Sequence, residues 1–254
     1  MNIAVCVKQV VTRDWPLRVN ETAEWVRDND ASFEMNEPDA YALEEALRLK
    51  EQHGGEVVVC VAGPPRFTQV IREALARGAD RAIHVKHEQF AFADANVVAS
   101  SLATAMLPEQ FDLVLTGLQS NDQGFGQTGV ILAERLGLPH ATIVMEVDAG
   151  GVNGLRVKRE LEGGWFQWVS MPTPALLTIQ SGINQLRYAT LKGIMAAKRK
   201  EVRSVEPEEL QPAGQHIVRL YVPEKEKATR FIEGGPEAAS HELVRLLREE
   251  ARVL

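Results

Sequence analysis

Short apolar runs alternate with amphipathic stretches from the first residues to Ala141, and this alternation limits the folds that the chain can adopt. The apolar runs expected to be strands are residues 3–7, 56–61, 81–85 and 112–116. The stretches expected to be helices are residues 40–52, 67–77, 94–107 and 127–136. Strands and helices in this alternation form a parallel sheet with right-handed crossovers and helices on both faces. The sequence therefore predicts an α/β fold with a doubly wound, mostly parallel sheet.

The pattern changes after Ala141. Residues 155–161 and 165–170 are two strand candidates, and the Glu162-Gly163-Gly164 between them is typical of a hairpin turn. The later elements are expected to be a strand at 175–180, a basic helix at 188–200, a proline-containing linker at 206–215 and an amphipathic helix at 237–252. We therefore predict an α/β domain of residues 1–205 followed by a C-terminal arm of residues 206–254.

The charge and the apolar content of the chain argue against two classes of protein. With a net charge of −7 and a pI near 5.5, the chain lacks the basic surface that binds nucleic-acid phosphates. No run approaches the roughly 20 apolar residues of a membrane helix, and residues 1–8 lack the layout of a secretory signal. We therefore expect a cytoplasmic protein that is not membrane-embedded.

Cys6 and Cys60 lie in apolar runs, so we expect reduced thiols without a catalytic role. No cluster of histidine and cysteine residues has the spacing of metal ligands.

The loop at residues 117–129 carries the most chemical information. It follows a buried strand candidate and opens a helix, which is where open α/β sheets bind ligands. The amides and the positive dipole end of that helix suit a phosphate, and Gly124, Gly126 and Gly129 let the backbone approach it. The loop lacks the P-loop lysine motif, and residues 8–11 lack the glycine fingerprint of dinucleotide folds. These residues alone leave two possibilities open, an anion or nucleotide site and a plain polar connection.

Two further segments are expected near the same edge of the sheet. Residues 35–46 place Pro38 and Asp39 at a helix start, which fits either a capped surface helix or a loop beside the ligand. The loop at residues 61–64 follows the second strand and opens onto the same edge.

Five stretches of the chain, taken in order, carry a more specific pattern. They are residues 5–10 (VCVKQV), residues 35–36 (MN) with 42–51 (ALEEALRLKE), residues 74–85 (ALARGADRAIHV), the loop at 117–129 with its Gln127-Thr128-Gly129, and residues 187–191 (RYATL) with Ile194, Met195, Ala197 and Lys198. Their order and spacing resemble those of the beta subunits of electron transfer flavoproteins over most of residues 1–205. The resemblance implies a Rossmann-like sheet of the adenine-nucleotide-binding type with a C-terminal extension.

The resemblance also implies two cofactors. In this family a larger alpha subunit makes most of the contacts to a redox-active FAD, and the beta subunit binds AMP as a structural ligand. The nucleotide contacts carried over to this chain are Cys6, Asn36, Glu37, Pro38, Asp39, Ala62, Gly117, Leu118, Gln119, Ser120, Asn121, Asp122, Gln123, Gly124, Phe125, Gly126, Gln127 and Thr128. The phosphate is expected on the amides around Gly126, Gln127 and Thr128. The departures from the family pattern are Gly126 for a frequent asparagine, Glu37-Pro38 for proline and an aromatic residue, and Arg13 for a tyrosine.

The tract at residues 188–200 resembles the family's recognition loop. The resemblance implies that Leu191 enters an apolar pocket of partner dehydrogenases, with Tyr188, Ile194 and Met195 beside it. The residues alone favour another interpretation, a solvated basic helix whose Leu191 packs on its own domain. The arm resembles the extension that embraces the alpha subunit, with Leu243 and its neighbours buried against it; the alternative is a helix packed on its own core.

The function implied is that of an electron carrier subunit rather than an enzyme. It would receive electrons from dehydrogenases, such as the acyl-CoA dehydrogenases of fatty acid oxidation, and pass them to a respiratory quinone oxidoreductase. Two alternatives stay open: an electron-bifurcating flavoprotein with a second FAD in the AMP pocket, and a stand-alone adenine-nucleotide-binding module. A triphosphate-dependent ligase or hydrolase is disfavoured because no triphosphate loop and no base–nucleophile pair is visible in the sequence.

Overall fold

The computed structural model describes residues 1–254 except 92, 152–153, 208 and 224–228. The described residues form two compact units, Met1–Arg219 and Leu220–Leu254. The division of the chain after residue 205 that the sequence suggests stays a prediction.

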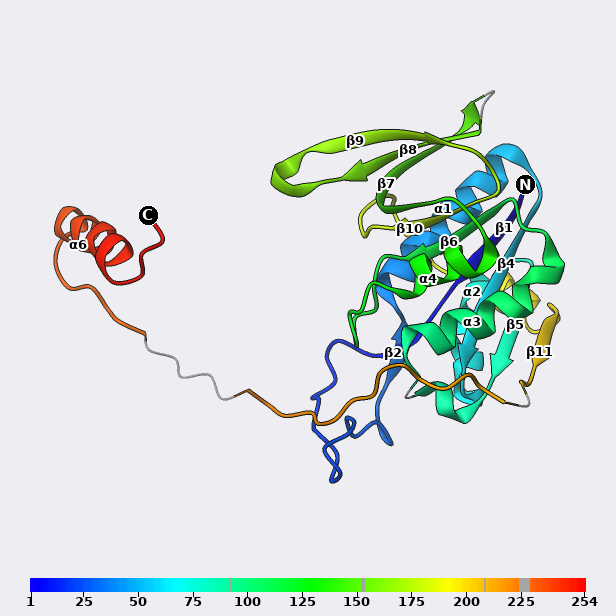
Figure 1. Cartoon of the computed structure of the whole chain (residues 1–254), viewed down its shortest axis with the longest axis horizontal. Coiled ribbons are helices and arrows are strands. Elements are labelled where there is room, and N and C mark those ends of the chain that lie inside the picture. The colour runs from blue at the N-terminus through cyan, green and yellow to red at the C-terminus, as the bar shows by residue number, and fades with distance from the viewer. Residues whose placement is uncertain (92, 152–153, 208, 224–228) are drawn as a thin grey trace. The chain divides into compact units, whose positions relative to one another are not determined.

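The first unit is built on a sheet that, within the described residues, has the strand order β11-β5-β4-β1-β6-β10-β7-β8-β9 (Figure 1). Its strands are β1 (Asn2–Cys6), β4 (Glu56–Gly63), β5 (Arg81–Lys86), β6 (Leu113–Gly117), β7 (His140–Gly151), β8 (Gly154–Glu160), β9 (Phe166–Met171), β10 (Ala175–Ile179) and β11 (Val202–Val205). Neighbours from β11 to β7 run parallel, whereas β8 and β9 add an antiparallel edge. The predicted α/β class with a mostly parallel, doubly wound sheet is confirmed.

Helices cover both faces of this sheet. They are α1 (Glu37–His53), α2 (Thr68–Arg77), α3 (Ala95–Met106), α4 (Thr128–Leu136) and α5 (Leu191–Ala197), with short turns η1 (Pro65–Phe67), η2 (Glu88–Ala91), η3 (Leu107–Glu109) and η4 (Glu162–Gly164). Residues of α1 and α2 share one core with Ile3 and Val5, and residues of α3 and α4 share the other with Ala4 and Val58. Successive strand side chains point to opposite faces, so strands covered on both sides must be apolar throughout. Because of that requirement, the central strands form apolar runs that can be predicted from the sequence.

The sequence patterns do not predict four of the strands. β2 (Gln9–Val11) and β3 (Phe33–Met35) form a separate antiparallel pair across a long excursion of the chain. β7 and β11 lie nearer the edges of the large sheet, where polar residues such as Asp148 and Arg203 interrupt the apolar pattern. The predicted hairpin is confirmed as β8 and β9. Among the described residues, none of the helices combines the length and apolar character needed to cross a bilayer.

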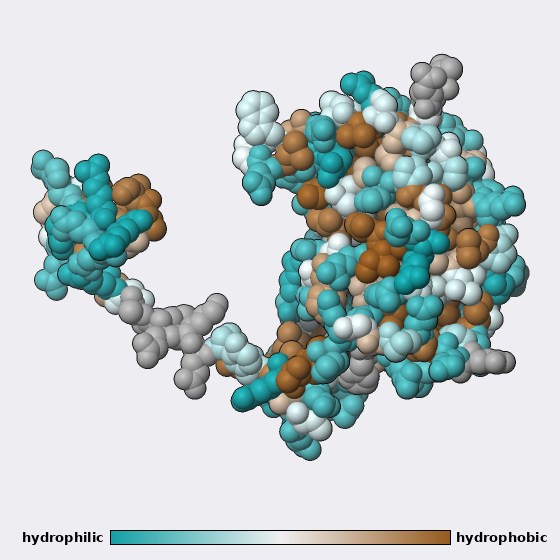
Figure 2. Space-filling model, viewed as in Figure 1, coloured by the Kyte–Doolittle hydropathy of each residue, from teal (hydrophilic) through white to brown (hydrophobic). Residues whose placement is uncertain are grey.

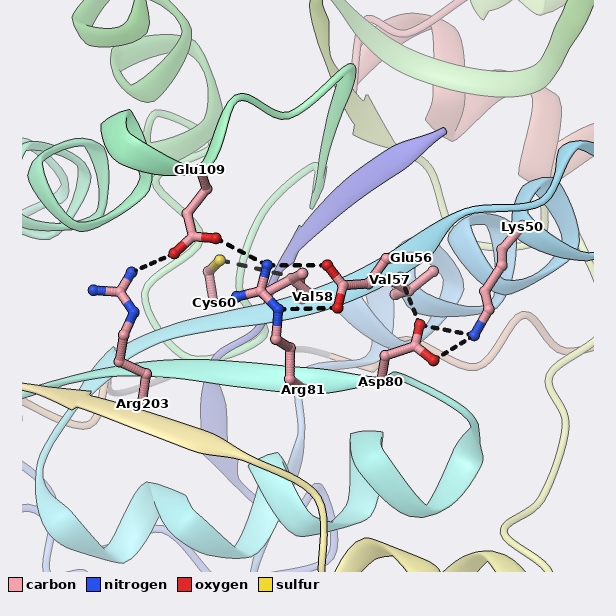
Figure 3. Close-up of polar contacts among 9 residues, drawn as sticks. All are labelled: Lys50, Glu56, Val57, Val58, Cys60, Asp80, Arg81, Glu109 and Arg203. Atoms are coloured by element: carbon pink, nitrogen blue, oxygen red, sulfur yellow. Dashed lines mark hydrogen bonds and ion pairs between the residues drawn. The ribbon is translucent and has the colours of Figure 1, made fainter.

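Ion pairs fasten β11 to the neighbouring elements (Figure 3). Arg81 of β5 binds both carboxylate oxygens of Glu56 at 3.0 Å and one oxygen of Glu109 at 2.8 Å. Arg203 of β11 binds the other oxygen of Glu109 at 2.8 Å and the carbonyl of Ala105 at 2.9 Å. The late strand is thereby linked to β4, β5 and α3 by side chains as well as by its parallel pairing with β5.

Candidate functional site

A crevice lies at the carboxyl ends of β1, β4 and β6. The chain order of the sheet reverses there, because β4 lies on one side of β1 and β6 on the other. Open α/β sheets bind ligands at such a switch point. The volume open to the centres of water molecules is about 100 Å³, several times the roughly 10–15 Å³ needed to hold one water. The protein's own side chains therefore do not fill the crevice.

Most of the residues expected at the nucleotide line this crevice. They are Cys6, Asn36, Asp39, Ala62, Gly117, Leu118, Gln119, Ser120, Gln123, Phe125, Gly126, Gln127 and Thr128. The other expected residues, Glu37, Pro38, Asn121, Asp122 and Gly124, do not line it in the described part of the chain. Glu37 forms an exposed ion pair with Arg13, and Asn121 and Asp122 bind neighbouring side chains that support the loop.

Asn36 and Asp39 hold the loop between β6 and α4 against the start of α1. The amide of Asn36 donates to the carbonyl of Gln119 at 3.0 Å and accepts from the backbone N–H of Asn121 at 2.9 Å. The carboxylate of Asp39 accepts from the N–H groups of Lys8 at 2.8 Å and Gly117 at 3.0 Å. Burial raises the pKa of Asp39 to about 7, although these hydrogen bonds act in the opposite direction. The segment expected beside the ligand therefore shapes the loop as well as lining the crevice.

Two glycines bring the backbone of this site into close contact. A Cβ on Gly117 would lie 2.7 Å from Cβ of Pro38, and a Cβ on Gly129 would lie 2.6 Å from Oγ1 of Thr116. Only glycine lets β6 pass the start of α1 and lets α4 begin directly against the sheet. Gly126 has φ +62, the left-handed region that glycine and asparagine adopt most readily.

The crevice has a polar side and an apolar side. On the polar side α4 begins at Thr128, and the N–H groups of a first helical turn have no partners within the helix. On the apolar side Phe90, Val98 and Leu102 line the wall. Unpaired amides at the positive end of a helix dipole suit a phosphate, and an apolar wall suits a planar base. The arrangement therefore fits a phosphorylated nucleotide.

The thiol of Cys6 lies at this crevice with low reactivity. Cys6 and Cys60 are register partners on β1 and β4, and both thiols are free and buried. Burial raises the pKa of both, that of Cys60 to about 12. Protonated thiols at neutral pH are poor nucleophiles.

A second candidate surface is the outward side of α5 and the residues before it. Leu191 is 84% exposed and Tyr188 is 91% exposed, and Ile194 and Met195 are also exposed. The interpretation that Leu191 packs on its own domain is therefore wrong. The helix is also shorter than the predicted 188–200, because Thr190 caps its first turn and the chain leaves the helix after Ala197.

The inward side of α5 is anchored tightly to α2. A Cβ on Gly193 would collide with the carbonyl of Ala76, so the two helices approach closely. Arg72 of α2 donates to the carbonyl of Ala197 at 2.6 Å, and Lys200 donates to the carbonyl of Leu75 at 2.9 Å. The exposed apolar side chains are thus presented from a firmly held helix.

The tract before α5 is held by α1. The guanidinium of Arg187 donates two hydrogen bonds to Glu44, at 2.8 and 2.9 Å, and two to Glu51, at 2.6 and 3.2 Å. The amide of Asn184 donates to Glu45 at 3.0 Å. The charged residues of α1 that look like a solvated face in the sequence therefore position this tract.

Gly129, one of the loop glycines expected near the phosphate, also lines the crevice. The residues that line it without having been expected there are Val7, Lys8, Phe67, Phe90, Ala93, Ala95, Val98, Leu102 and Thr116. Five of them, Phe90, Ala93, Ala95, Val98 and Leu102, lie in η2, in α3 or just before α3, and their approach to the crevice depends on the crossover from β5. Lys8 lies two residues after the end of β1, so its position beyond the carboxyl end of a central strand was a usable indication.

In the second unit, α6 (Pro236–Glu249) has Leu243, Leu246 and Leu247 at helical spacing. None of its described residues is buried. Figure 2 shows hydrophobic residues gathered along one side of this helix and hydrophilic residues along the other.

Together these features define a class of doubly wound α/β protein whose switch-point crevice suits a phosphorylated ligand. Comparisons with known proteins agree with this class and narrow it. Residues 25–210 match the electron transfer flavoprotein domain. The chain is 36% identical to the electron transfer flavoprotein subunit beta of Methylophilus methylotrophus, with 98% of each chain covered. It is 33% identical to that of Bacillus subtilis and 36% identical to the mitochondrial protein of Oryza sativa subsp. japonica, with 100% of each chain covered. The chain belongs to the electron transfer flavoprotein family and is similar to its beta subunits over its full length.

Proposed function

We propose that this chain is the beta subunit of a heterodimeric electron transfer flavoprotein and binds AMP in the crevice. The observation that carries the proposal is the open crevice between β1 and β6, bounded by the first turn of α4 in a chain of this family. The names of its relatives, which call them subunit beta, support an alpha subunit as partner. The chain alone is then an electron carrier component and not an enzyme.

The residues present fit an adenylate. The amides at Gly126, Gln127 and Thr128 would hold the phosphate, and the wall formed by Phe90 and Val98 would lie against the base. When bound, the FAD of the heterodimer supplies the redox chemistry. The alpha subunit makes most of the contacts to it. This chain's residues hold the nucleotide, help enclose the flavin and present the docking surface.

The partners of the complex follow from its proposed role. Dehydrogenases, acyl-CoA dehydrogenases among them, would dock at Leu191, Tyr188, Ile194 and Met195, and a quinone oxidoreductase would accept the electrons. The small apolar surface, with Lys192, Lys198 and Arg199 nearby, suits a transient contact with an acidic rim on the partner. We place the complex in the cytoplasm.

Ligand analysis of the intact heterodimer tests the proposal. The chain is produced together with the alpha subunit from the same source, and ligands released by heat are identified by mass spectrometry and quantified. One AMP and one FAD per heterodimer are expected. Two FAD and no AMP would replace the proposal with a bifurcating flavoprotein, and a stable monomer without an alpha partner would favour a stand-alone nucleotide-binding module.

A matched pair of glycine variants tests the position of the phosphate. Gly126 and Gly137 both have positive φ, near +62 and +67. A new Cβ would meet nothing within 4 Å at Gly137 and would only touch the carbonyl of Leu118, at 3.8 Å, at Gly126. Gly126→Val should lower the AMP content because its side chain points into the loop near the phosphate. Gly137→Val, at the other end of α4, carries similar backbone strain and should retain AMP. Equal AMP content in both variants would contradict the assignment of the loop.

A further inference from the structure

Lys8 is the only lysine or arginine among the crevice-lining residues in the described part of the chain. In an anion site, a single cation is expected to face the ligand. The ammonium group instead contacts the loop, with Nζ 2.7 Å from Oδ1 of Asp122, 2.9 Å from Oε1 of Gln123 and 3.5 Å from Oγ of Ser120. A lysine ammonium has three N–H donors, and the loop offers one acceptor for each.

The loop residues that bind Lys8 are held in turn by their neighbours. The N–H of Gly124 donates to the carbonyl of Ser120 at 2.9 Å, and the N–H of Gln123 donates to Oδ1 of Asp122 at 2.7 Å. Burial acts to raise the pKa of Asp122, but the ammonium of Lys8, together with hydrogen bonds from Ser120 and Gln123, holds that pKa below its ordinary value. The Lys8–Asp122 pair is partly shielded, with side chains 31% and 25% exposed, so solvent screens it less than a surface pair.

The place of this contact along the loop gives it a role. Asp39 and Asn36 fix the first half of the loop, at Gly117, Gln119 and Asn121. Lys8 holds the residues that follow, immediately before the glycine-containing stretch that leads into α4. Without Lys8, the chain between Asn121 and Thr128 would lose its side-chain tether to the segment that follows β1.

We propose that Lys8 is a positioning residue for the nucleotide site: it tethers the loop through Ser120, Asp122 and Gln123, sets where the loop amides meet the phosphate, and does not itself bind the ligand. This inference rests on the proposed function. The alternative role for Lys8 is that of a direct phosphate ligand. In that role its ammonium group would have to leave the three acceptors that it now contacts in the loop.

Two variants that break the same contact from opposite sides test the inference. Lys8→Met and Asp122→Ala are made in the full chain, the complex with the alpha subunit is depleted of nucleotide, and AMP and adenosine are titrated by calorimetry. Both variants should raise the Kd for AMP by about tenfold and leave the Kd for adenosine unchanged, because only the phosphate end is displaced. The double variant should bind AMP no more weakly than either single variant, because both changes remove one tether.

The opposite results would overturn the inference in distinct ways. Tighter AMP binding by Asp122→Ala would show that a released Lys8 serves as a direct ligand. Equal AMP affinity in Lys8→Met and wild type would remove any role for Lys8. Hydrogen exchange of the loop amides in the nucleotide-free complex is a second readout, and it should be faster in both variants; unchanged exchange would refute the tether. A wild-type complex that binds neither AMP nor adenosine would instead refute the proposed function, whatever the exchange shows.

Discussion

The two units of the chain differ in what they bury. In the unit Met1–Arg219, large side chains such as Leu177 and Ile83 are fully buried between the sheet and its helices. In the unit Leu220–Leu254, Leu243 of α6 is 47% exposed and no residue of the helix is buried. A short amphipathic helix gains most of its stability from packing of its apolar side. The first unit therefore has a core of its own, whereas the described residues of α6 form none. We propose that the alpha subunit covers the apolar side of α6.

Deleting Leu220–Leu254 gives the largest expected effect and tests this division directly. The shortened chain ends at Arg219 and keeps the contacts of Asp94 with the N–H groups of Gly214 and Gln215, at 2.6 and 3.0 Å. It should keep its circular dichroism spectrum and its Tm within about 2 °C, because little core is lost. Co-purification with the alpha subunit should fall below detection. An unfolded shortened chain, or one that still binds the alpha subunit, would break the comparison.

The same substitution in each unit sharpens the contrast. Leu177→Ala, in the fully buried strand β10, should lower the free energy of unfolding by about 2–5 kcal/mol, because it leaves a cavity in a packed core. Leu243→Ala, in α6, should change it by less than about 0.5 kcal/mol in the chain without its partner. Urea unfolding followed by circular dichroism measures both. Similar losses would show that α6 contributes to the stability of the isolated chain.

Buried carboxylates are also confined to the first unit among the described residues. The ordinary pKa of an aspartate side chain is 3.8. Burial disfavours the charged form of Asp39 and raises its pKa to about 7 in the folded chain. When folding raises the pKa of an acid, the acid contributes its full stabilisation at pH values below its pKa in the unfolded chain. That contribution is lost as the pH rises through its pKa in the folded chain. Between about pH 4 and pH 8, the free energy of unfolding of the wild type should therefore fall by on the order of 4 kcal/mol relative to that of Asp39→Asn.

The comparison between variants isolates this effect from other titrating groups. Asparagine offers a single carbonyl acceptor to the two N–H groups that Asp39 serves, which costs Asp39→Asn a constant amount at every pH. Only the slope of the difference against pH reports the ionisation. Glu242→Gln, at an exposed ion pair of α6, is the control and should leave the slope unchanged. Parallel profiles for the wild type and Asp39→Asn would contradict the assignment.

The sequence predicted the parts of the fold whose apolar pattern follows from burial on both faces. β1, β4, β5, β6 and their helices were found within a few residues of their ends. β2, β3 and β11 were missed because strands of three or four residues carry no period of their own and depend on distant partners. A hydrophobic period records burial, so it says little about such edge elements.

The candidate site was predictable to a similar extent. Its loop could be located because a strand end and a helix start adjoin in the sequence at residues 117–129. The wall formed by Phe90, Val98 and Leu102 could not, since those residues reach the crevice only through the crossover from β5. The support given by Lys8 and Asn36 depends on side-chain geometry between distant segments. The exposure of Leu191 also ran against the residue-based expectation, because nothing local shows that Gly193 turns the other side of α5 toward α2.

The smallest expected effect on stability concerns Leu191, an exposed apolar residue of the first unit. Leu191 is exposed like the residues of α6, but it projects from a helix anchored to α2. Leu191→Ala should leave the free energy of unfolding, the FAD content and the AMP content unchanged. It should slow flavin reduction by a subsaturating acyl-CoA dehydrogenase by about tenfold, since truncating an interface anchor costs more than 1 kcal/mol of binding.

The matched control is Leu107→Ala, which removes an exposed leucine just after α3, in the helix layer that covers the other face of the sheet. It should change neither stability nor electron transfer. If the dehydrogenase reduces the flavin of both variants at the wild-type rate, the exposed side of α5 is not the docking surface. If reduction is slow only in Leu191→Ala, a single leucine on a firmly held helix serves a contact that must also dissociate, in contrast to the lasting contact proposed for the arm.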